Sequence, residues 1–318
     1  MVALVVAGLW GRVGCGFGRR HTGRYGARMD HAEAAKVAFR VHRVLDPLHS
    51  STYFAPETEQ HLTRVGLRPG RMCYFAGRSA PFGAIWPGAV AATFYNFNPE
   101  LVARHIPRAW TLATPTEVIA ARFEAVDAIF RRLLGDDVVA SAEVAEAAAL
   151  ARQASEACTP EGRPLYAAHA DVKWPTEPHV VLWHAITLLR EFRGDGHTAA
   201  LIAGGLGGLG ALITHTATGK GFLEGSAKAS RGWSDEQWAA EVDNLRARGL
   251  LDVAGLLTEQ GTELRGEIED CTNRAAAAPW LRLGAEKTDR LHDLGRQLSR
   301  TAVAAGAFPA GVFATPRA

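Results

Sequence analysis

The chain is poor in the residues that build covalent or metal-based frameworks. Its 318 residues include four cysteines, which lie far apart and form no CxxC pair. This scarcity argues against a disulfide framework and a cysteine-based zinc site, and it is compatible with a reducing cytoplasm. The chain also has no run of about 18 apolar residues, so we expect neither a membrane-spanning helix nor a membrane partner.

Acidic residues are missing from the start of the chain. The first is Asp30, whereas residues 1–28 contain five arginines. We interpret residues 1–28 as a disordered leader, or as the product of a start codon placed too far upstream, with Met29 as the true first residue. Without them the chain has 30 basic and 33 acidic residues, so its formal net charge changes from +2 to −3. The basic charge that would support nucleic-acid binding therefore belongs to the leader.

Strand-like patterns are also few. From Met29 onward, most of the chain has apolar residues at spacings of three and four, the period of an amphipathic helix. Only GRMCYFAG and LLDVAGLLT resemble strands, and the second predicts a small hairpin that turns near Gly255. We therefore predict a mainly α fold with short β-hairpins.

A weak internal repeat indicates two related domains. Residues 70–76 match residues 162–168 at four of seven positions, and a loop containing proline and then an apolar helix follow each copy. The simplest organisation is a pair of winged-helix-like domains joined by a helical connector. The expected bounds are 29–114 for the first domain, 115–160 for the connector and 161–318 for the second domain.

The second half has a recognisable order of elements. A helix, a serine-capped helix SDEQWAAEVDNLRARGL, the expected hairpin and a long helix follow one another, which resembles the winged helix-turn-helix of MarR-type regulators. The segments YFAGRSAPFG, FYNFNPELV and LREFRGDGH, with RGLLD, GLLTEQG and APW, are similar to an actinobacterial family known as helix-turn-helix or SalK-like. This resemblance extends from about Asp30 to Gly311. It implies tandem MarR-like winged-helix domains and far less about activity.

The candidate recognition helix has an unfavourable charge for DNA. Ser234 and Gln237 predict a capping box, and Asp235 and Glu236 suit the positive end of a helix. A DNA-reading helix needs Arg or Lys there, because many of its contacts go to phosphates. Three basic residues just upstream could compensate in part: Lys220, Lys228 and Arg231. DNA binding is therefore disfavoured, and a ligand-responsive transcriptional regulator is the alternative hypothesis.

The segment WHAITLLREFRGDGH places titratable residues on an apolar helix. His184 and Glu191 are seven residues apart, so we expect them on one face and about 10 Å apart along the axis. Gly194 is expected to end this helix and Asp195 to cap the next one. His197 would then lie in a first turn, where the helix dipole keeps it neutral. Glu191 with His197 or His184 is the candidate catalytic acid–base pair, although a lone histidine is more often structural.

The first half supplies further candidate contacts. If the two repeats are related by a pseudo-twofold axis, Arg78 and the FYNFN segment face LREFRGDGH across an interface, where ligand cavities commonly form. Arg78 and Tyr95 would polarise a substrate carbonyl. Asn96, Trp183 and Arg190 are further candidates for substrate binding. The simpler interpretation of Arg190 is a solvated side chain or a salt bridge to a carboxylate.

For several other sequence patterns, a structural role is a simpler explanation than a functional one. We expect Phe94 and Phe97 in the core and Asn98 as a helix cap. GLGGLG at 205–210 satisfies GxGxxG but follows a helical segment, so it predicts a turn where backbones pack closely and not a nucleotide site. The histidines of the second half lack any known metal-binding spacing, so a metal site is a minority hypothesis. We expect neither a metal nor a cofactor.

These features predict a small-molecule-binding protein with tandem winged-helix-like domains. The first hypothesis is a cofactor-independent acid–base enzyme of specialised metabolism, catalysing a dehydration or a conjugate-addition cyclisation on a small apolar or polyketide-like ligand. The alternatives are the transcriptional regulator and a non-catalytic binding protein. A homodimer is compatible with the sequence.

Overall fold

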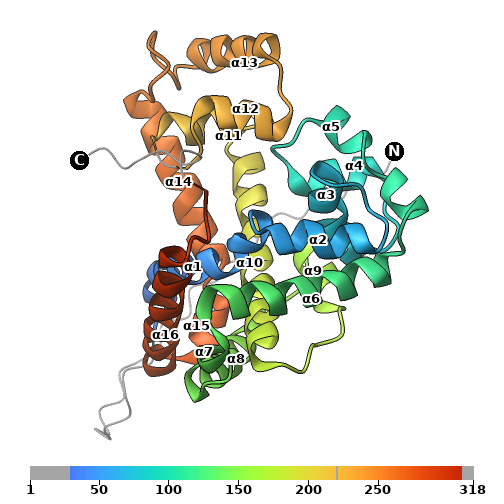
Figure 1. Cartoon of the computed structure of the whole chain (residues 1–318). Helices are drawn as coiled ribbons and strands as arrows, with labels where there is room; N and C mark the ends of the chain where they lie inside the picture. The colour runs from blue at the N-terminus through green and yellow to red at the C-terminus, as the bar shows by residue number, and fades with distance from the viewer. Residues whose placement is uncertain (1–28, 220, 310–318) are drawn as a thin grey trace, which may run out of the picture.

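The structure is a computed structural model that describes residues 29–219 and 221–309. The predicted leader, residues 1–28, and Lys220 lie outside the described residues. The described part is mainly helical, as predicted, and its helices form a lower bundle, a side lobe and a head (Figure 1). Within the described ranges, no single helix is long and apolar enough to cross a membrane.

The lower bundle joins the two ends of the described chain. Asp30 begins the first helix by accepting a hydrogen bond from the Glu33 amide at 2.8 Å, and Thr114 and Glu117 form a capping box for α6. A buried apolar cluster holds the bundle together, with Leu45, Ile129, Trp183 and Leu294 among its members. The bundle helices are α1 (His31–Ser50), α6 (Pro115–Leu134), α7 (Asp136–Val139), α8 (Ala142–Ser155), α15 (Ala278–Leu283) and α16 (Ala285–Ala304).

The side lobe consists of short helices, many of which begin with proline at a first-turn position. Its own apolar cluster includes Phe75, Phe94 and Phe97, as predicted for the last two. The lobe contains η1 (Ser51–Tyr53), α2 (Pro56–Arg64), α3 (Arg71–Ser79), η2 (Ala80–Phe82), α4 (Pro87–Phe94), α5 (Pro99–Ala103), η3 (Arg108–Thr111) and α9 (Pro164–Ala170).

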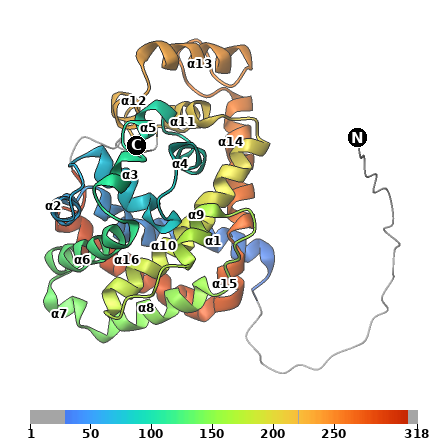
Figure 2. The ribbon, with the colours of Figure 1, turned by 90° about the vertical axis from the view of Figure 1, so that its right-hand side faces the viewer.

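Two long helices connect the bundle to the head. They are α10 (Pro178–Ala203) and α14 (Glu259–Ala275), which run side by side in both views (Figure 2). The head adds α11 (Gly208–Ala217), α12 (Glu224–Arg231) and α13 (Asp235–Ala247) around a third apolar cluster that includes Trp238 and Leu245. Ser234 and Gln237 form the predicted capping box of α13.

Three local predictions differ from the structure. GRMCYFAG is helix α3, because its buried residues, among them Met72, Phe75 and Ser79, follow a helical period. LLDVAGLLT does not form a strand pair that belongs to a sheet. Among the described residues it has one isolated bridge between Leu251 and Leu257, which closes the turn around Gly255. The short β-hairpins are therefore not confirmed. The division into tandem domains stays a prediction.

The third difference concerns the helix that carries LREFRGDGH. We expected Gly194 to end one helix and Asp195 to begin another. Instead, both residues lie inside α10, which is one helix of 26 residues. The backbone of Gly194 does not adopt the left-handed conformation that often ends a helix. Burial of α10 against α8, α9 and α14 supplies enough packing to offset the weak helix propensity of Gly194 and Gly196.

Candidate functional site

The site is a cavity of 360 Å³ where α10 passes between the side lobe and the head. We call it the central cavity. Residues of α1, α3, α4, α9, α10, α11, α12 and α14 and of the segment that follows α4 line it. It brings together six of the eight predicted site residues: Arg78, Tyr95, Asn96, Arg190, Glu191 and His197. The prediction that Arg78 and FYNFN face LREFRGDGH agrees with this geometry.

Glu191 lies at the centre of an ion cluster. Its Oε2 is 2.9 Å from Nη2 of Arg78, and its Oε1 is 3.0 Å from Nη1 of Arg190. Arg190 also contacts the carboxylate of Asp46 at 2.8 Å, so the simpler interpretation of Arg190 as a salt-bridge partner is confirmed. Burial alone would raise the pKa of Glu191, but the two guanidinium groups outweigh it and hold that pKa well below its ordinary value. Glu191 is therefore an ionised anchor for two arginines and a weak proton acceptor.

His197 is neutral, although the cause differs from the predicted one. It lies inside α10 and not in a first turn. Burial, followed by the cations Arg265 and Arg193, lowers the pKa of His197 to about 3. Its Nδ1 is 2.8 Å from the Thr272 hydroxyl, which itself donates to the carbonyl of Ile268. Nδ1 therefore carries the proton, and Nε2 is left as an acceptor.

Asp195 has a different role from the predicted cap of a following helix. Its Oδ2 accepts a hydrogen bond at 2.9 Å from the backbone amide of Tyr166, in the first turn of α9. Asp195 also lines the central cavity. Burial raises the pKa of Asp195 to about 6, since the backbone hydrogen bond and Arg78 only partly offset the loss of hydration. Among the predicted and newly found cavity residues, this carboxyl group is the best suited to exchange a proton near neutral pH.

Tyr95 and Asn96 tie the side lobe to the head. The Tyr95 hydroxyl donates to the Leu206 carbonyl at 2.6 Å, and a β-carbon at Gly208 would overlap the Tyr95 carbonyl. This close approach explains the glycine-rich turn, as predicted for GLGGLG. Tyr95 itself has a positive φ of 52°. The Asn96 side chain accepts from Nε of Arg231 at 3.3 Å. Both candidates thus have structural partners within the protein.

His184 and Trp183 do not line the central cavity. Trp183 is 1% exposed and stacks on His49 with ring centroids 5.2 Å apart. His184 packs edge-on against Trp174 at 4.7 Å, and burial lowers the pKa of His184 to about 4. The rise of about 10 Å over seven helical residues carries His184 away from Glu191 and into the bundle. The structure therefore does not bring His184 together with the proposed partner Glu191.

The central cavity has an excess of positive charge. Among the described residues, Arg231 and Arg265 line it without a carboxylate at ion-pair distance, and Nη1 of Arg265 is buried with no hydrogen-bond partner. Arg231 lies between two aromatic rings, 4.6 Å from the centroid of Phe97 and 4.8 Å from that of Phe222. Burial lowers the pKa of both arginines, which shows how poorly the cavity compensates their charge. An anion would supply the missing partner.

Several cavity residues were not identified from the sequence. His42 and Asp46 are four residues apart on α1, a spacing that places them on one helical face and could have been noticed. Tyr74, Arg231 and Arg265 carry no local signal, because their relevance depends on elements distant in the sequence.

The described residues contain no group of three or more His, Cys, Asp or Glu side chains placed to hold a metal ion. Two of the histidines considered as ligands have other partners. His169 accepts from Nη1 of Arg122 at 3.1 Å, and His179 is 2.7 Å from Asp127.

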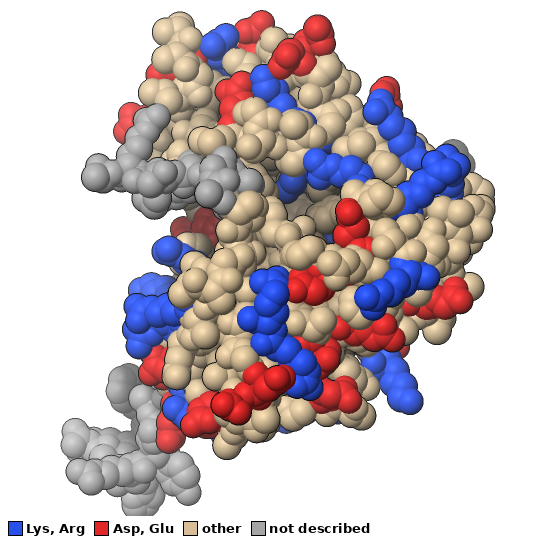
Figure 3. Space-filling view, in the orientation of Figure 1, with Lys and Arg blue, Asp and Glu red and all other residues tan. Residues whose placement is uncertain are grey.

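The head has the element order of a helix-turn-helix, and two of its basic residues, Lys228 and Arg231, are not directed at a nucleic acid. Lys228 binds Asp235 at 2.6 Å, and Arg231 is directed into the central cavity. Asp235, Glu236 and Asp243 are exposed on α13. Figure 3 shows acidic and basic side chains mixed over this end of the molecule.

Comparison with known proteins agrees with this architecture. The model of a helix-turn-helix family matches residues 38–309. The chain belongs to this helix-turn-helix family. The match covers all three parts of the fold, from α1 to the end of α16. No curated protein and no solved structure matches the chain. A SalK-like identity and MarR-like tandem domains stay predictions.

Proposed function

We propose that this helix-turn-helix protein binds a small molecule with an acidic group in the central cavity, and that it acts there as an acid–base enzyme without a cofactor. The observation that carries the proposal is the pair of arginines, Arg231 and Arg265, which line the cavity without a carboxylate partner. A buried cation without a counter-ion is costly, so an anionic ligand would stabilise the folded protein. Phe94, Leu201 and Leu212 offer apolar contacts for the carbon skeleton.

The acid–base part of the proposal is supported by Asp195. Its carboxyl group lies in the same cavity, and the pKa of Asp195, raised by burial to about 6, is close to neutral pH. Such a group can both donate and accept a proton under physiological conditions. Asp195 therefore replaces Glu191 as the proposed proton carrier, while Arg78 and Arg190 would contact the substrate as well as hold Glu191.

A titration with phenyl phosphate tests the proposal. We expect calorimetry to detect binding of phenyl phosphate and not of neutral benzyl alcohol. Arg231→Gln should weaken it about 10- to 100-fold, the effect of losing a hydrogen bond to a charged group. Arg300→Gln, which removes an exposed arginine on α16, is the matched control and should change nothing. Equal affinity of wild type and Arg231→Gln would contradict the proposal.

The same titration examines Asp195. An anion in the cavity would raise the pKa of Asp195 further, so binding at about pH 6.5 should take up protons from the buffer. Calorimetry in two buffers with different ionisation enthalpies measures this uptake. Asp195→Asn should still bind phenyl phosphate but take up fewer protons than wild type, and the difference isolates Asp195 because phenyl phosphate itself ionises at about pH 6. Unchanged uptake in Asp195→Asn would exclude Asp195 as the group that responds to the ligand.

The regulator remains a second candidate function because the chain belongs to a helix-turn-helix family. In that case the central cavity would be a sensor site, since Arg231 at the end of α12 connects the cavity to the turn before α13. The charges on α13 do not favour this alternative.

A further inference from the structure

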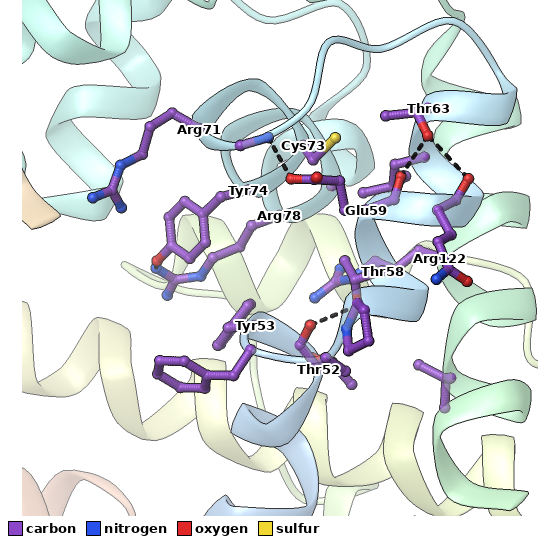
Figure 4. Close-up of a pocket in the computed structure, with 18 residues that line it drawn as sticks. Thr52, Tyr53, Thr58, Glu59, Thr63, Arg71, Cys73, Tyr74, Arg78 and Arg122 are labelled. Carbon is purple, nitrogen blue, oxygen red and sulfur yellow. Dashed lines mark hydrogen bonds between the residues drawn. The ribbon is translucent and has the colours of Figure 1, made fainter. Parts of the chain in front are cut away.

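A second cavity, of 580 Å³, lies beside the central one, between η1, α2, α3 and α6. We call it the side cavity. Its volume is within the range of about 300–1,000 Å³ typical of small-molecule sites. Figure 4 shows Tyr53, Tyr74, Arg78 and Arg122 around it. Tyr74 and Arg78 form a wall shared with the central cavity, whereas Arg122 and Tyr53 line the side cavity only.

Arg122 carries a buried charge without a counter-ion. It is 8% exposed, and among the described residues no carboxylate forms an ion pair with it. Its Nη1 donates to Nε2 of His169 at 3.1 Å, and its Nη2 has no hydrogen-bond partner. His169 cannot act as the counter-ion, because an imidazole is either neutral or cationic. Burial and Arg122 lower the pKa of His169 to about 3, so this side chain is neutral. Burial also lowers the pKa of Arg122, as expected for an uncompensated cation.

The position of Arg122 is defined by its neighbours. Its guanidinium lies 4.7 Å from the ring centroid of Trp183, and the buried residues of α6 on either side of it belong to the apolar clusters of the bundle and of the side lobe. A side chain held in this way is preorganised for a ligand, because little rotamer freedom remains to be lost on binding. The free Nη2 group and the planar fork match the geometry of a carboxylate.

The Tyr53 hydroxyl already has an acceptor within the protein. The Tyr53 hydroxyl is 2.8 Å from Nε2 of His49, and Nδ1 of His49 is 3.0 Å from the Thr187 hydroxyl. Since Thr187 donates to the Trp183 carbonyl, His49 carries its proton on Nδ1 and accepts from Tyr53 at Nε2. The Tyr53 proton is thus already used within the protein and does not compete for an anion.

The rest of the side cavity is largely apolar. Its acidic lining residue is Glu59, which is exposed at the rim and accepts from the Gly70 amide at 2.6 Å. The apolar part of its lining is formed by Phe54, Ala55, Pro56, Leu62 and Val126, the last of which is one turn from Arg122 on α6. A cationic end next to an apolar wall fits a molecule with one acidic group and a hydrophobic body.

We infer that the side cavity is a binding site for a small apolar monocarboxylate, whose carboxylate is bound by Arg122 and whose carbon skeleton packs against Leu62, Val126 and the Tyr53 ring. This site is separate from the proposed site in the central cavity. The ligand has a charged end and an apolar body, which match the arginine and the apolar lining of the cavity. Its neutral amide lacks the charge that Arg122 would bind, so the amide should bind poorly.

The test uses 4-bromobenzoate, with 4-bromobenzamide as the neutral control and the whole chain as the protein. Calorimetry should show binding of the acid, and Arg122→Gln should weaken it about 10- to 100-fold. Arg71→Gln removes a half-buried arginine from the wall of the same cavity and should change the affinity about twofold or less. Equal binding of the acid and the amide, or equal binding by Arg122→Gln and wild type, would overturn the inference.

Crystals of the wild-type protein with 4-bromobenzoate provide a readout that needs no variant. The anomalous signal of bromine should lie in the side cavity, among Leu62, Val126 and Tyr53. A bromine peak in the central cavity alone, or none in either cavity, would overturn the inference. Arg231→Gln separates this test from that of the proposed function, because it should weaken phenyl phosphate binding and leave 4-bromobenzoate binding unchanged.

Discussion

Asp195 combines burial, a backbone hydrogen bond and a place in the central cavity. Its Oδ2 accepts from the Tyr166 amide, which ties α10 to the first turn of α9. Burial raises the pKa of Asp195 to about 6, above its ordinary value of 3.8. The folded state therefore disfavours the charged form, and ionisation of Asp195 costs stability.

The unfolding free energy of the protein should therefore depend on pH through Asp195. As pH rises from about 4 to about 6, wild type should lose about 3 kcal/mol of unfolding free energy relative to Asp195→Asn. Asn keeps an oxygen acceptor for the Tyr166 amide but has no charge to bury. Urea unfolding of both proteins at several pH values measures the difference, and a difference that does not vary with pH would contradict the prediction.

At the scale of elements, α10 is the feature on which the site depends. It contributes Arg190, Glu191, Asp195 and His197 to the central cavity within two turns. A break at Gly194 would have turned Asp195 and His197 away from Glu191. The continuous helix keeps all four on surfaces that face α1, α3, α9 and α14.

Two glycines of α10 offer a matched pair of substitutions. A β-carbon at Gly194 would meet Oε2 of Glu191 at 3.6 Å, an ordinary contact, whereas one at Gly196 would lie 2.8 Å from Nη1 of Arg163 and 3.2 Å from Cβ of Ala275. Gly194→Ala should therefore stabilise the protein by about 0.5–1 kcal/mol through helix propensity. Gly196→Ala should destabilise it by about 1–3 kcal/mol through overpacking.

Urea unfolding of both glycine variants decides this prediction. Opposite signs would show that α10 is continuous at Gly194 and tightly packed at Gly196. A loss of stability in Gly194→Ala would indicate that Gly194 ends the helix, as its sequence context had suggested.

At the scale of the whole molecule, the head and the cavities have different charge. The central cavity has arginines without carboxylate partners, while the exposed residues of α13 include Asp235, Glu236 and Asp243. The basic residues that could have compensated are occupied in the described part of the chain, because Lys228 pairs with Asp235 and Arg231 lines the cavity. This distribution would attract small anions to the interior and would disfavour phosphates at α13.

We therefore expect the chain from Met29 to bind DNA upstream of its gene no more tightly than random DNA. Gel-shift titrations across a salt series measure this, because contacts to several phosphates weaken steeply as salt is added. The full chain is the comparison, since the five arginines of residues 1–28 can bind DNA without sequence preference. Specific, salt-sensitive binding by the chain from Met29 would establish the regulator.

Much of the helical structure follows from local sequence. The capping pairs Thr114 with Glu117 and Ser234 with Gln237 begin helices because their hydrogen bonds are made within a single turn. Asn98 caps α5 for the same reason. The close backbone packing at GLGGLG and the membership of a helix-turn-helix family were also evident from the sequence.

The chemistry of the site was decided by tertiary structure. Arg78 and Glu191 are 113 positions apart, and the pairing sets the charge state of Glu191. The raised pKa of Asp195 and the uncompensated charge of Arg122 likewise arise from burial among elements distant in the sequence. Helix periodicity depends on neighbours a few residues away, whereas desolvation and ion pairing depend on which distant segments pack together. The sequence by itself therefore determined most of the helices and the family, and the packing of α1, α3, α6, α9 and α14 around α10 determined which side chains line the two cavities.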